Sequence, residues 1–415
     1  MISRAASVAY VWVWLPRETI PTVAGRLESD AGRLIFNYGR RYLERKDAIS
    51  LYLPELPLRA GKLPLLPGLE MPGCLRDAAP DAWGRRVITN RLLGTKQNAI
   101  DLDAVDELTF LLESGSDRVG ALDFQRSATD YISREAESAT LESLLDSTAR
   151  LEEGRPLDEV LDRALLHGSS IGGARPKALI EDGDRKYIAK FGSMTDVRNV
   201  VKGEFVAMRL ADHVGLDVAD VELRRALKKD VLLVERFERH RTSAGWTRKL
   251  MVSALTLLGL NEMTARYASY VDLAEIVRHR FSNPEATLHE LFSRLVFNVL
   301  CGNTDDHARN HAAFWDGRTL ALTPAYDICP QPRSGGEASQ AMLITEGSNL
   351  SKLSLCVEAA HHFRLSELDA RSEIDRQVTA IREAWDSVAE EAELPETERN
   401  SLWGRQFLNP FAFEP

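Results

Sequence analysis

Two aspartates and an asparagine, spaced as phosphoryl transfer requires, stand in the second half of this 415-residue chain. The stretch 303–310 reads Asn-Thr-Asp-Asp-His-Ala-Arg-Asn, which places Asp305 five residues before Asn310, and Asp327 follows after a short interval. In kinases of the protein type, an aspartate faces the acceptor hydroxyl, while an asparagine five positions later and a further aspartate hold Mg²⁺. The spacing therefore predicts Asp305 as the catalytic residue and Asn310 and Asp327 as metal ligands.

The residues around this motif support the assignment. Asp306 competes with Asp305 but lies only four residues from Asn310, so it fits the spacing less well. Residues 311–315, a turn at Asp316-Gly317 and residues 319–322 predict a hairpin that returns Asp327 to the neighbourhood of Asn310. No glycine follows Asp327, so the switching role of an Asp-Phe-Gly element is not implied. The alternative interpretation of this stretch is an ordinary polar loop with an Asn-Thr-Asp turn.

A lysine and a glutamate complete the expected machinery. Lys190 ends an apolar strand over residues 186–191, where kinases carry the lysine that contacts the α and β phosphates. A helix is predicted from about residue 196 to 213, and Glu204 falls within its apolar face of Val197, Val201, Phe205 and Met208. We expect Glu204 to pair with Lys190. The alternatives are an edge-strand lysine and a glutamate whose carboxylate reaches solvent from the edge of the apolar face.

Two further segments could contact a nucleotide. Residues 168–177 are small and flexible, and the backbone of Gly172, Gly173 and Ala174 could approach phosphate oxygens, with Arg175 and Lys177 adding positive charge. The segment is neither a Walker A motif nor a G-x-G-x-x-G loop, and a flexible hairpin entry is the alternative interpretation. Residues 235–237 (Glu235, Arg236 and Phe237) leave a second predicted hairpin, where a chain passing between lobes would offer backbone groups to adenine.

The remaining pattern predicts an α+β chain with a two-lobed, protein-kinase-like fold, a small N-terminal β-rich subdomain and a mostly helical C-terminal lobe. Strands are expected at 8–14, 34–39, 50–53 and 121–126, and helices at 81–93, 104–112, 135–154 and 156–166. Hairpins follow at 178–191 and 221–237, the second turning at 228–230, with helices beyond it. We expect residues 1–125 to form the N-terminal subdomain, 126–240 the nucleotide-binding lobe and 241–415 the helical lobe.

Composition narrows the class of protein. With 44% hydrophobic and 27% charged residues the chain is typical of a soluble globular protein, and a formal charge of -10 disfavours a protein that grips nucleic acid over a broad surface. Four scattered cysteines without a CxxC pair indicate reduced thiols rather than a disulfide or zinc framework. No apolar run approaches the ~18 residues of a membrane span, so a cytoplasmic location without membrane contact is expected.

Taken together, six stretches resemble the HipA family, the serine/threonine kinase toxins of bacterial type II toxin–antitoxin modules. The stretches occur in the family's order at residues 170–177, 187–190, 203–216, 234–239, 303–310 and 322–328. The resemblance implies that Asp305 is catalytic, that Asn310 and Asp327 bind Mg²⁺ and that Lys190 binds the phosphates of ATP. It further implies that the loop Gly172 to Lys177 and the residues His307, Arg309, Asn310 and Tyr326 line the nucleotide.

The resemblance also implies regulation and partners. Ser170 matches the serine that family members autophosphorylate, and a phosphate beside the nucleotide loop would expel the loop and silence the enzyme. The alternative is that Ser170 merely caps a turn. The expected partner is a helix-turn-helix, HipB-like antitoxin that binds operator DNA, so that this chain contacts DNA only indirectly. Family substrates are translation-related proteins such as aminoacyl-tRNA synthetases, whose modification arrests growth and promotes persistence. The resemblance allows a homodimer within the toxin–antitoxin complex.

Two other functions remain open from the sequence. A small-molecule phosphotransferase of the aminoglycoside or choline type would use the same Asp, Asn and Asp arrangement, although the Ser170 loop and the N-terminal subdomain disfavour it. A non-catalytic co-repressor subunit would require a damaged nucleotide site, whereas every expected polar group is present. Labelling with ATP and Mg²⁺ distinguishes them, because a toxin kinase labels itself on Ser170.

Overall fold

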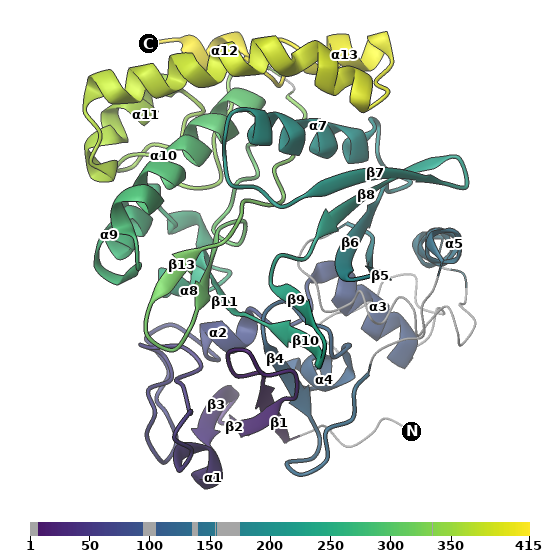
Figure 1. Ribbon diagram of the computed structural model, residues 1–415, viewed down its shortest axis with the longest axis vertical. Coiled ribbons are helices and arrows are strands. Elements are labelled where there is room, and N and C mark those ends of the chain that lie inside the picture. The colour runs from purple at the N-terminus through teal and green to yellow at the C-terminus, as the bar shows by residue number, and fades with distance from the viewer. Residues whose placement is uncertain (1–6, 94–104, 135–139, 154, 156–174, 334) are drawn as a thin grey trace. The chain divides into compact units, whose positions relative to one another are not determined.

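The computed structural model describes residues 7–93, 105–134, 140–153, 155, 175–333 and 335–415. The chain divides by its contacts into two compact units, whose elements are labelled in Figure 1. Unit 1 comprises residues 1–195, 224–252 and 315–318, and unit 2 comprises residues 196–223, 253–314 and 319–415. The predicted segments 1–125 and 126–240 thus fall largely within one compact unit. Across the ranges given above, no helix combines the length and apolar composition that crossing a bilayer requires.

Unit 1 opens with an antiparallel sheet in the order β3-β2-β1-β4. Its strands are β1 (Val8–Val13), β2 (Thr22–Asp30), β3 (Arg33–Tyr38) and β4 (Leu122–Gln125). The central strand β1 buries Ala9, Val11 and Val13 completely on one face, as its alternating pattern predicts. Strand β2 was not predicted because charged residues and Gly25 interrupt its apolar pattern. A Cβ at Gly25 would lie 2.3 Å from a backbone oxygen of β3, so only glycine lets the two strands pair here.

Short helices follow this sheet. They are α1 (Arg40–Leu43), α2 (Gly73–Arg76), α3 (Ala82–Leu93), α4 (Glu107–Glu113) and α5 (Leu141–Glu152). The side chains of Asp106 and Thr140 accept backbone N–H bonds at the starts of α4 and α5, which satisfies donors that a helix leaves unpaired there. The strand predicted at 50–53 is wrong, because these residues form bends and turns. The helix predicted at 156–166 lies outside the described residues.

A second sheet in the order β5-β6-β8-β7 completes the core of unit 1. Its strands are β5 (Lys177–Asp182), β6 (Arg185–Phe191), β7 (Val221–Ala226) and β8 (Lys229–Glu235). The second hairpin turns at Leu227 and Lys228, which both have positive φ angles of 47° and 63°, rather than at 228–230 as predicted. Trp83 and Val87 of α3 pack with Phe191 and Val231 of this sheet in one apolar cluster. The N-terminal segment therefore shares a core with the second sheet.

Three short strands that the sequence did not predict continue the chain beyond β8. They are β9 (Arg239–Thr242), β10 (Gly245–Arg248) and β11 (Leu250–Ser253). Strands β9 and β10 form an antiparallel hairpin in which Arg239 pairs with Arg248. Three arginines and a histidine within these strands interrupt the apolar pattern from which strands are predicted.

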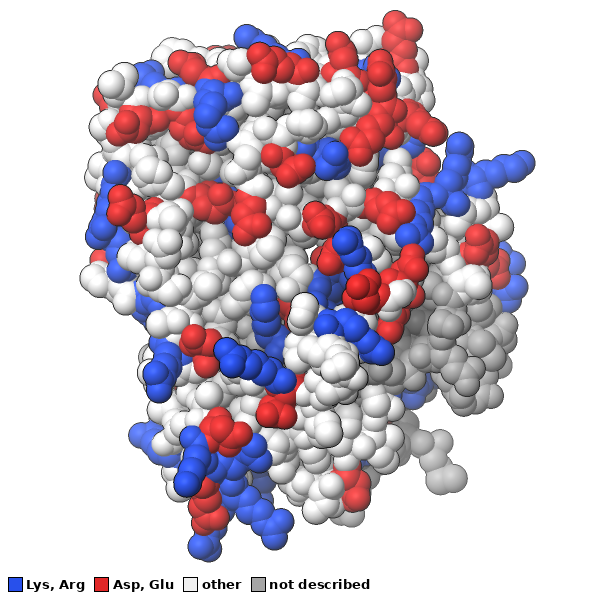
Figure 2. All heavy atoms as spheres, viewed as in Figure 1, with Lys and Arg blue, Asp and Glu red and all other residues white. Residues whose placement is uncertain are grey.

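Unit 2 is mostly helical. Its helices are α7 (Val200–His213), α8 (Ala254–Leu257), α9 (Tyr270–Arg280), α10 (Pro284–Cys301), α11 (Leu353–Ala359), α12 (Glu367–Glu391) and α13 (Glu396–Leu402), with the strands β12 (Ala312–Trp315) and β13 (Leu320–Leu322). Helix α10 is buried along most of its length and forms the centre of the unit, while α7 lies against α12. The exposed face of α12 and α13 is mainly acidic (Figure 2).

Helix α7 starts later than predicted. The side chain of Asn199 caps it by accepting from the N–H of Lys202, so the helix begins at Val200 rather than near residue 196. Val197 is consequently outside the helix and is 99% exposed, which removes it from the predicted apolar face. Val201, Phe205 and Met208 are buried as expected.

Candidate active site

The candidate catalytic loop starts where α10 ends. Gly302 terminates the helix with a φ angle of 70°, and a Cβ at this position would lie 2.8 Å from the carbonyl oxygen of Gln406. Only glycine adopts this conformation without strain and also fits the space. The next residue, Asn303, donates its backbone N–H to the Asn298 carbonyl at 2.9 Å and its side-chain amide to the Asn298 side chain at 2.9 Å. The end of α10 therefore fixes the direction in which the loop leaves.

The loop 303–310 folds around the backbone carbonyl of Asp305. This carbonyl accepts from the N–H of His307 at 2.8 Å and from the side-chain amide of Asn310 at 3.2 Å. Asp305 is exposed, whereas Asn310 is buried, with 7% of its surface accessible. Because the Asn310 nitrogen donates to Asp305, its side-chain oxygen is the atom directed elsewhere. The predicted catalytic aspartate and the predicted metal ligand thus meet in one tight turn.

The neighbouring aspartate points into the protein. Asp306 is 2% exposed, accepts a hydrogen bond from the Tyr270 hydroxyl and lies 2.9 Å from Nε2 of His311. Burial, and then the negative charge of Asp306, raise the pKa of Tyr270 well above its ordinary value, so Tyr270 remains a protonated donor. Asp306 is thereby occupied by structural bonds. Spacing alone had separated the two aspartates, but Tyr270 lies 36 residues away and no sequence signal identified it.

The returning segment brings Asp327 back to the loop. Strands β12 and β13 form the predicted hairpin, and the hydroxyl of Tyr326 donates to the carbonyl of Arg309 at 2.8 Å. This bond joins the residue before Asp327 to the residue before Asn310. Asp327 has a positive φ angle of 60°, which is uncommon for a residue with a side chain and turns the backbone sharply at this point. The two predicted metal ligands therefore belong to adjoining segments of unit 2.

Arg294 of α10 donates hydrogen bonds to the returning segment and to the chain beside it. Its guanidinium is 2% exposed and donates to the carbonyls of Asp217 at 3.0 Å and Thr323 at 2.9 Å. The N–H of Ala325 also donates to the Asp217 carbonyl, at 2.7 Å. Such a buried cation could not be assigned from the sequence, because the arginine lies inside an apolar helix pattern.

The donor set fits a magnesium ion that is shared with phosphates. Mg²⁺ prefers oxygen ligands and is usually held by one or two side chains together with phosphate oxygens and water. Asn310 and Asp327 supply an amide oxygen and a carboxylate of that kind. Within the part of the chain that the structure describes, no cluster of three or more His, Cys, Asp or Glu side chains suited to a metal is found.

Lys190 and Glu204 belong to different units. Lys190 lies in the middle strand β6, opposite Lys177 on one side and Leu232 on the other, and its side chain is half-buried. Glu204 lies in α7 and is 3% exposed. A glutamate buried to that degree requires a partner, as the sequence argument assumed. The Lys190–Glu204 pair stays a prediction.

The glycine-rich loop is only partly described. Ser170, Gly172, Gly173 and Ala174 lie outside the described residues, so their predicted roles stay predictions. Lys177, where the loop enters β5, is 1% exposed and its ammonium binds the carboxylate of Asp81 at 2.9 Å. Trp83 also donates its indole N–H to the Lys177 carbonyl at 3.2 Å. Lys177 is therefore paired with a carboxylate inside unit 1, and its predicted phosphate contact stays a prediction.

Arg236 is likewise bonded to other groups of unit 1. Its backbone N–H donates to the Lys186 carbonyl at 2.8 Å, and its guanidinium is completely buried against Asp117 and Glu238, at 2.9 Å and 2.7 Å. Its amide and its side chain are thus bonded within unit 1, and the predicted contact of the Arg236 backbone with adenine stays a prediction. Glu235 forms an exposed ion pair with Arg185 at 2.9 Å, and Phe237 is half-buried.

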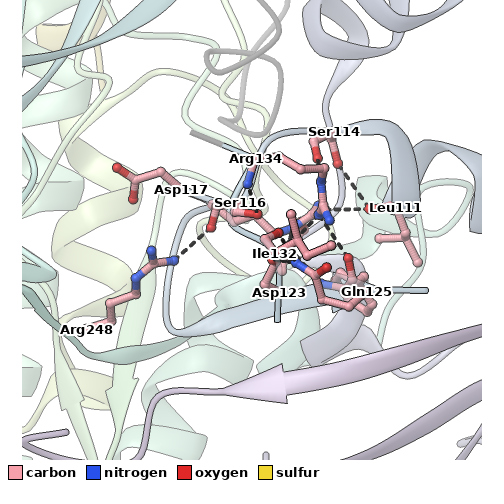
Figure 3. A network of polar contacts seen from close by, with 12 residues as sticks. Leu111, Ser114, Ser116, Asp117, Asp123, Gln125, Ile132, Arg134 and Arg248 are labelled. Carbon is pink, nitrogen blue, oxygen red and sulfur yellow. Dashed lines mark hydrogen bonds and ion pairs between the residues drawn. The ribbon is translucent and has the colours of Figure 1, made fainter. Parts of the chain in front are cut away.

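Arg236 belongs to an extensive buried cluster of charged side chains that the sequence did not reveal. Asp117 accepts from Arg236 and Arg239 at 2.9 Å and 3.0 Å through one oxygen, and from Lys186 at 2.6 Å through the other. Figure 3 shows the turn that carries Asp117, with Arg248 reaching the Ser116 carbonyl at 2.7 Å. Burial alone would raise the pKa of Asp117, but these cations outweigh it and hold the pKa well below its ordinary value.

The remaining predicted residues lie on the loop itself. Arg309 pairs with Glu262 through Nε at 3.1 Å, an exposed contact that anchors the outer side of the loop. His307 is half-buried, and its Nδ1 has no hydrogen-bond partner among the described groups. A buried imidazole nitrogen with unmet bonding capacity beside Asp305 is compatible with the predicted nucleotide contact.

Comparisons with known proteins identify relatives over both parts of the chain. The family model for the HipA-like C-terminal domain matches residues 169–389, and the model for the HipA N-terminal domain matches residues 13–125. Y4mE of Sinorhizobium fredii, a candidate kinase by name, is 27% identical over 334 residues, which is 74% of each chain. The serine/threonine-protein kinase toxin HipA of Shewanella oneidensis is 26% identical over 184 residues, covering 38% of this chain and 42% of the relative.

A solved structure has the same fold. A chain of the Shewanella oneidensis complex of HipA, HipB and operator DNA matches with a TM-score of 0.70 and 20% identity, covering 97% of this chain and 99% of that one. At this identity the match shows the fold alone. The predicted α+β, kinase-like fold is thereby confirmed.

Proposed function

Because this chain belongs to the HipA family, we propose that it is a serine/threonine protein kinase that uses Mg-ATP and acts as the toxin of a type II toxin–antitoxin pair. The named kinases among its relatives support the activity, and the resemblance of its six motif stretches supports the class of acceptor. No observation favours the non-catalytic co-repressor or the small-molecule phosphotransferase over the protein kinase.

One observation carries the proposal: Asp305 is exposed while Asp306 is buried and bonded. Only a carboxylate that reaches solvent can meet the hydroxyl of an acceptor protein. The Asp305 carbonyl holds Asn310 at 3.2 Å, so the acceptor-facing group and the metal ligand are linked within one turn. Tyr326 then ties the Asp327 segment to the same turn at 2.8 Å. These two bonds support the arrangement that phosphoryl transfer requires.

In the proposed reaction, Asp305 accepts a hydrogen bond from the serine or threonine hydroxyl and takes its proton as the oxygen attacks the γ-phosphorus. The bond between the γ-phosphorus and the bridging oxygen of ADP breaks, and ADP leaves with that oxygen. Asn310 and Asp327 would hold Mg²⁺, which neutralises charge on the phosphates when bound. Lys190 would steady the α and β phosphates, with Glu204 holding the lysine in place.

The finer parts of the proposal concern regulation and partners. Ser170 is the proposed autophosphorylation site, and Gly172, Gly173, Ala174 and Arg175 the proposed phosphate loop. The Shewanella relative was solved with HipB and operator DNA, which supports a helix-turn-helix antitoxin partner here and an indirect contact with DNA. A translation-related acceptor such as an aminoacyl-tRNA synthetase, and growth arrest leading to persistence, follow from the family resemblance.

The test is phosphoryl transfer from γ-labelled ATP with Mg²⁺ by the purified full-length chain, followed by mass-spectrometric mapping of the labelled residue. The proposal expects label on Ser170, Mg²⁺ dependence, and loss of label in Asp305→Asn. Induction in cells followed by phosphoproteomics, with Asp305→Asn as the matched control, would identify the acceptor protein. Label appearing only on a small molecule, or no transfer in the wild type, would refute the proposal.

A further inference from the structure

The loop that carries Asp305 is held by a buried group that the proposed reaction does not use. The group consists of Tyr270 from the first turn of α9, Asp306 from the loop and His311 immediately before β12. Tyr270 is completely buried, Asp306 is 2% exposed and His311 is 3% exposed. Their three polar atoms contact one another: the Tyr270 hydroxyl donates to one oxygen of Asp306, His311 Nε2 lies 2.9 Å from the other, and the hydroxyl lies 3.1 Å from Nε2.

The hydrogen-bond roles in this group follow from its chemistry. An ionised carboxylate is only an acceptor, so both of its neighbours must donate. Tyr270 donates through its hydroxyl, and His311 donates through Nε2. The Tyr270 and His311 rings also pack edge to face, with centroids 5.4 Å apart. Burying an aspartate is costly unless it is bonded in this way, so these contacts fix the direction of the Asp306 side chain.

Backbone bonds hold the same part of the loop from a second direction. The first two N–H groups of α8, those of Ala254 and Leu255, donate to the carbonyls of His311 at 2.7 Å and Ala308 at 3.1 Å. Tyr270 is itself anchored, because its N–H donates to the Leu343 carbonyl at 2.9 Å. Two separate segments, the start of α8 and Tyr270 of α9, therefore hold the side of the loop that carries Asp306, while Asp305 is exposed.

We propose that Tyr270, Asp306 and His311 are positioning residues for phosphoryl transfer, holding Asp306 inward so that Asp305 faces the acceptor and Asn310 faces the metal. Asp305 and Asp306 are consecutive, with Cα atoms about 3.8 Å apart, so fixing one side chain in the core constrains the backbone that aims the other. The expected loss of turnover rests on the proposed kinase function, whereas the ordering of the loop by this group is independent of it.

The competing explanation is that the group is ordinary core and affects only stability. Tyr42 provides a matched control, because it is 1% exposed, lies in the other unit and donates its hydroxyl to the Ile49 carbonyl at 2.8 Å. Tyr42→Phe and Tyr270→Phe each remove one buried hydroxyl and are expected to lower the melting temperature to a similar extent. Only Tyr270→Phe is expected to alter the loop.

The experiment measures three quantities for Tyr270→Phe, Asp306→Asn and Tyr42→Phe in the full-length chain. Hydrogen exchange followed by mass spectrometry reports the order of residues 303–311, a Mg-dependent non-hydrolysable ATP analogue reports nucleotide affinity, and labelled ATP reports turnover. We expect exchange within 303–311 to rise by about tenfold and turnover to fall by about a hundredfold in the first two variants, and affinity for the Mg-dependent analogue to weaken with them, because Asn310 lies in the loosened loop.

A conservative replacement gives a further check. His311→Gln retains an N–H donor for Asp306 and is expected to keep more turnover than His311→Leu, which retains none. If Tyr270→Phe and Asp306→Asn lower the melting temperature while hydrogen exchange in 303–311 stays at the wild-type rate, the group contributes only to stability and the positioning proposal is overturned. If exchange rises but the wild type transfers no phosphate, the kinase proposal fails while the ordering of the loop by this group stands.

Discussion

Removing the carboxylate of Asp117 should destabilise unit 1 more than any exposed charge substitution. Asp117 bonds Arg236, Arg239 and Lys186 at 2.6 to 3.0 Å, and it is 5% exposed. Hydrogen bonds to charged groups contribute about 1.5–3 kcal/mol each, and breaking a buried pair costs about 3–5 kcal/mol. Glu238 remains 2.7 Å from Arg236 and can neutralise part of the excess charge. We therefore expect Asp117→Ala to lower the free energy of unfolding by about 3–5 kcal/mol.

The assay is urea unfolding at 25 °C, followed by tryptophan fluorescence. Trp14 and Trp246 lie against Arg248 and Lys186 of this cluster, so they report its loss directly. Asp47→Ala is the matched control, because Asp47 pairs with Arg45 at the exposed surface and its loss should leave the unfolding midpoint unchanged.

The pH dependence follows from the depressed pKa of Asp117. An aspartate whose pKa is lower in the folded than in the unfolded protein contributes stability above its unfolded pKa of about 3.9. That contribution is lost as the pH falls through the folded value. The difference between wild type and Asp117→Ala should therefore be constant near neutral pH and shrink below about pH 4. A difference below about 1 kcal/mol at neutral pH, or one that grows on acidification, would refute the electrostatic account of the cluster.

Three further predictions concern the loop, the buried lysine and the metal ligand. Gly302→Ala should destabilise unit 2 by about 2–4 kcal/mol, because the φ angle is positive and the new Cβ would lie 2.8 Å from a carbonyl oxygen. The control is Gly347→Ala, which has a φ angle of 79° and no neighbour within 4 Å and should lower the melting temperature less than Gly302→Ala does. Burial raises the pKa of Asp81, and the cation of Lys177 opposes that rise. In Lys177→Met the native carboxyl should therefore keep its proton to higher pH than the unfolded one, so thermal melts should show the variant more stable at pH 5 than at pH 8. The opposite pH trend would contradict this pairing. Asp327→Asn should raise the Mg²⁺ concentration for half-maximal transfer by at least about tenfold, measured by Mg²⁺ titration, and an unchanged titration curve would exclude Asp327 as a ligand.

The sequence predicted those parts of the fold whose pattern is local. Strand β1, helix α3 and the β5–β6 hairpin follow from apolar alternation, helical spacing and a turn signal, and all three are observed. Strand β2 was missed because its pairing depends on Gly25 fitting against β3, which is a property of two strands together. The apolar face assigned to α7 extended too far because the cap at Asn199 was not recognised.

The candidate site could be predicted only where motif spacing is informative. The five-residue spacing favoured Asp305 over Asp306, and the bonds of Asp306 to Tyr270 and His311 are compatible with that prediction. Long-range pairing could not be predicted in the same way. Lys177 was predicted as positive charge beside a glycine-rich loop and Arg236 as a backbone contact at the hinge, and neither prediction revealed the buried ion pair that the side chain makes. Their partners Asp81 and Asp117 are 96 and 119 residues distant in sequence, so no local pattern links them.

The most direct test of the proposed function is the rate of phosphoryl transfer from Mg-ATP by the wild type and by Asp305→Asn, measured under single-turnover conditions with nucleotide affinity determined in parallel. Asn retains the size of the side chain but cannot accept the proton of the acceptor hydroxyl. The account predicts that the rate falls by about 10²–10⁴-fold while nucleotide affinity and melting temperature stay near wild-type values. Transfer at the wild-type rate by Asp305→Asn would contradict it.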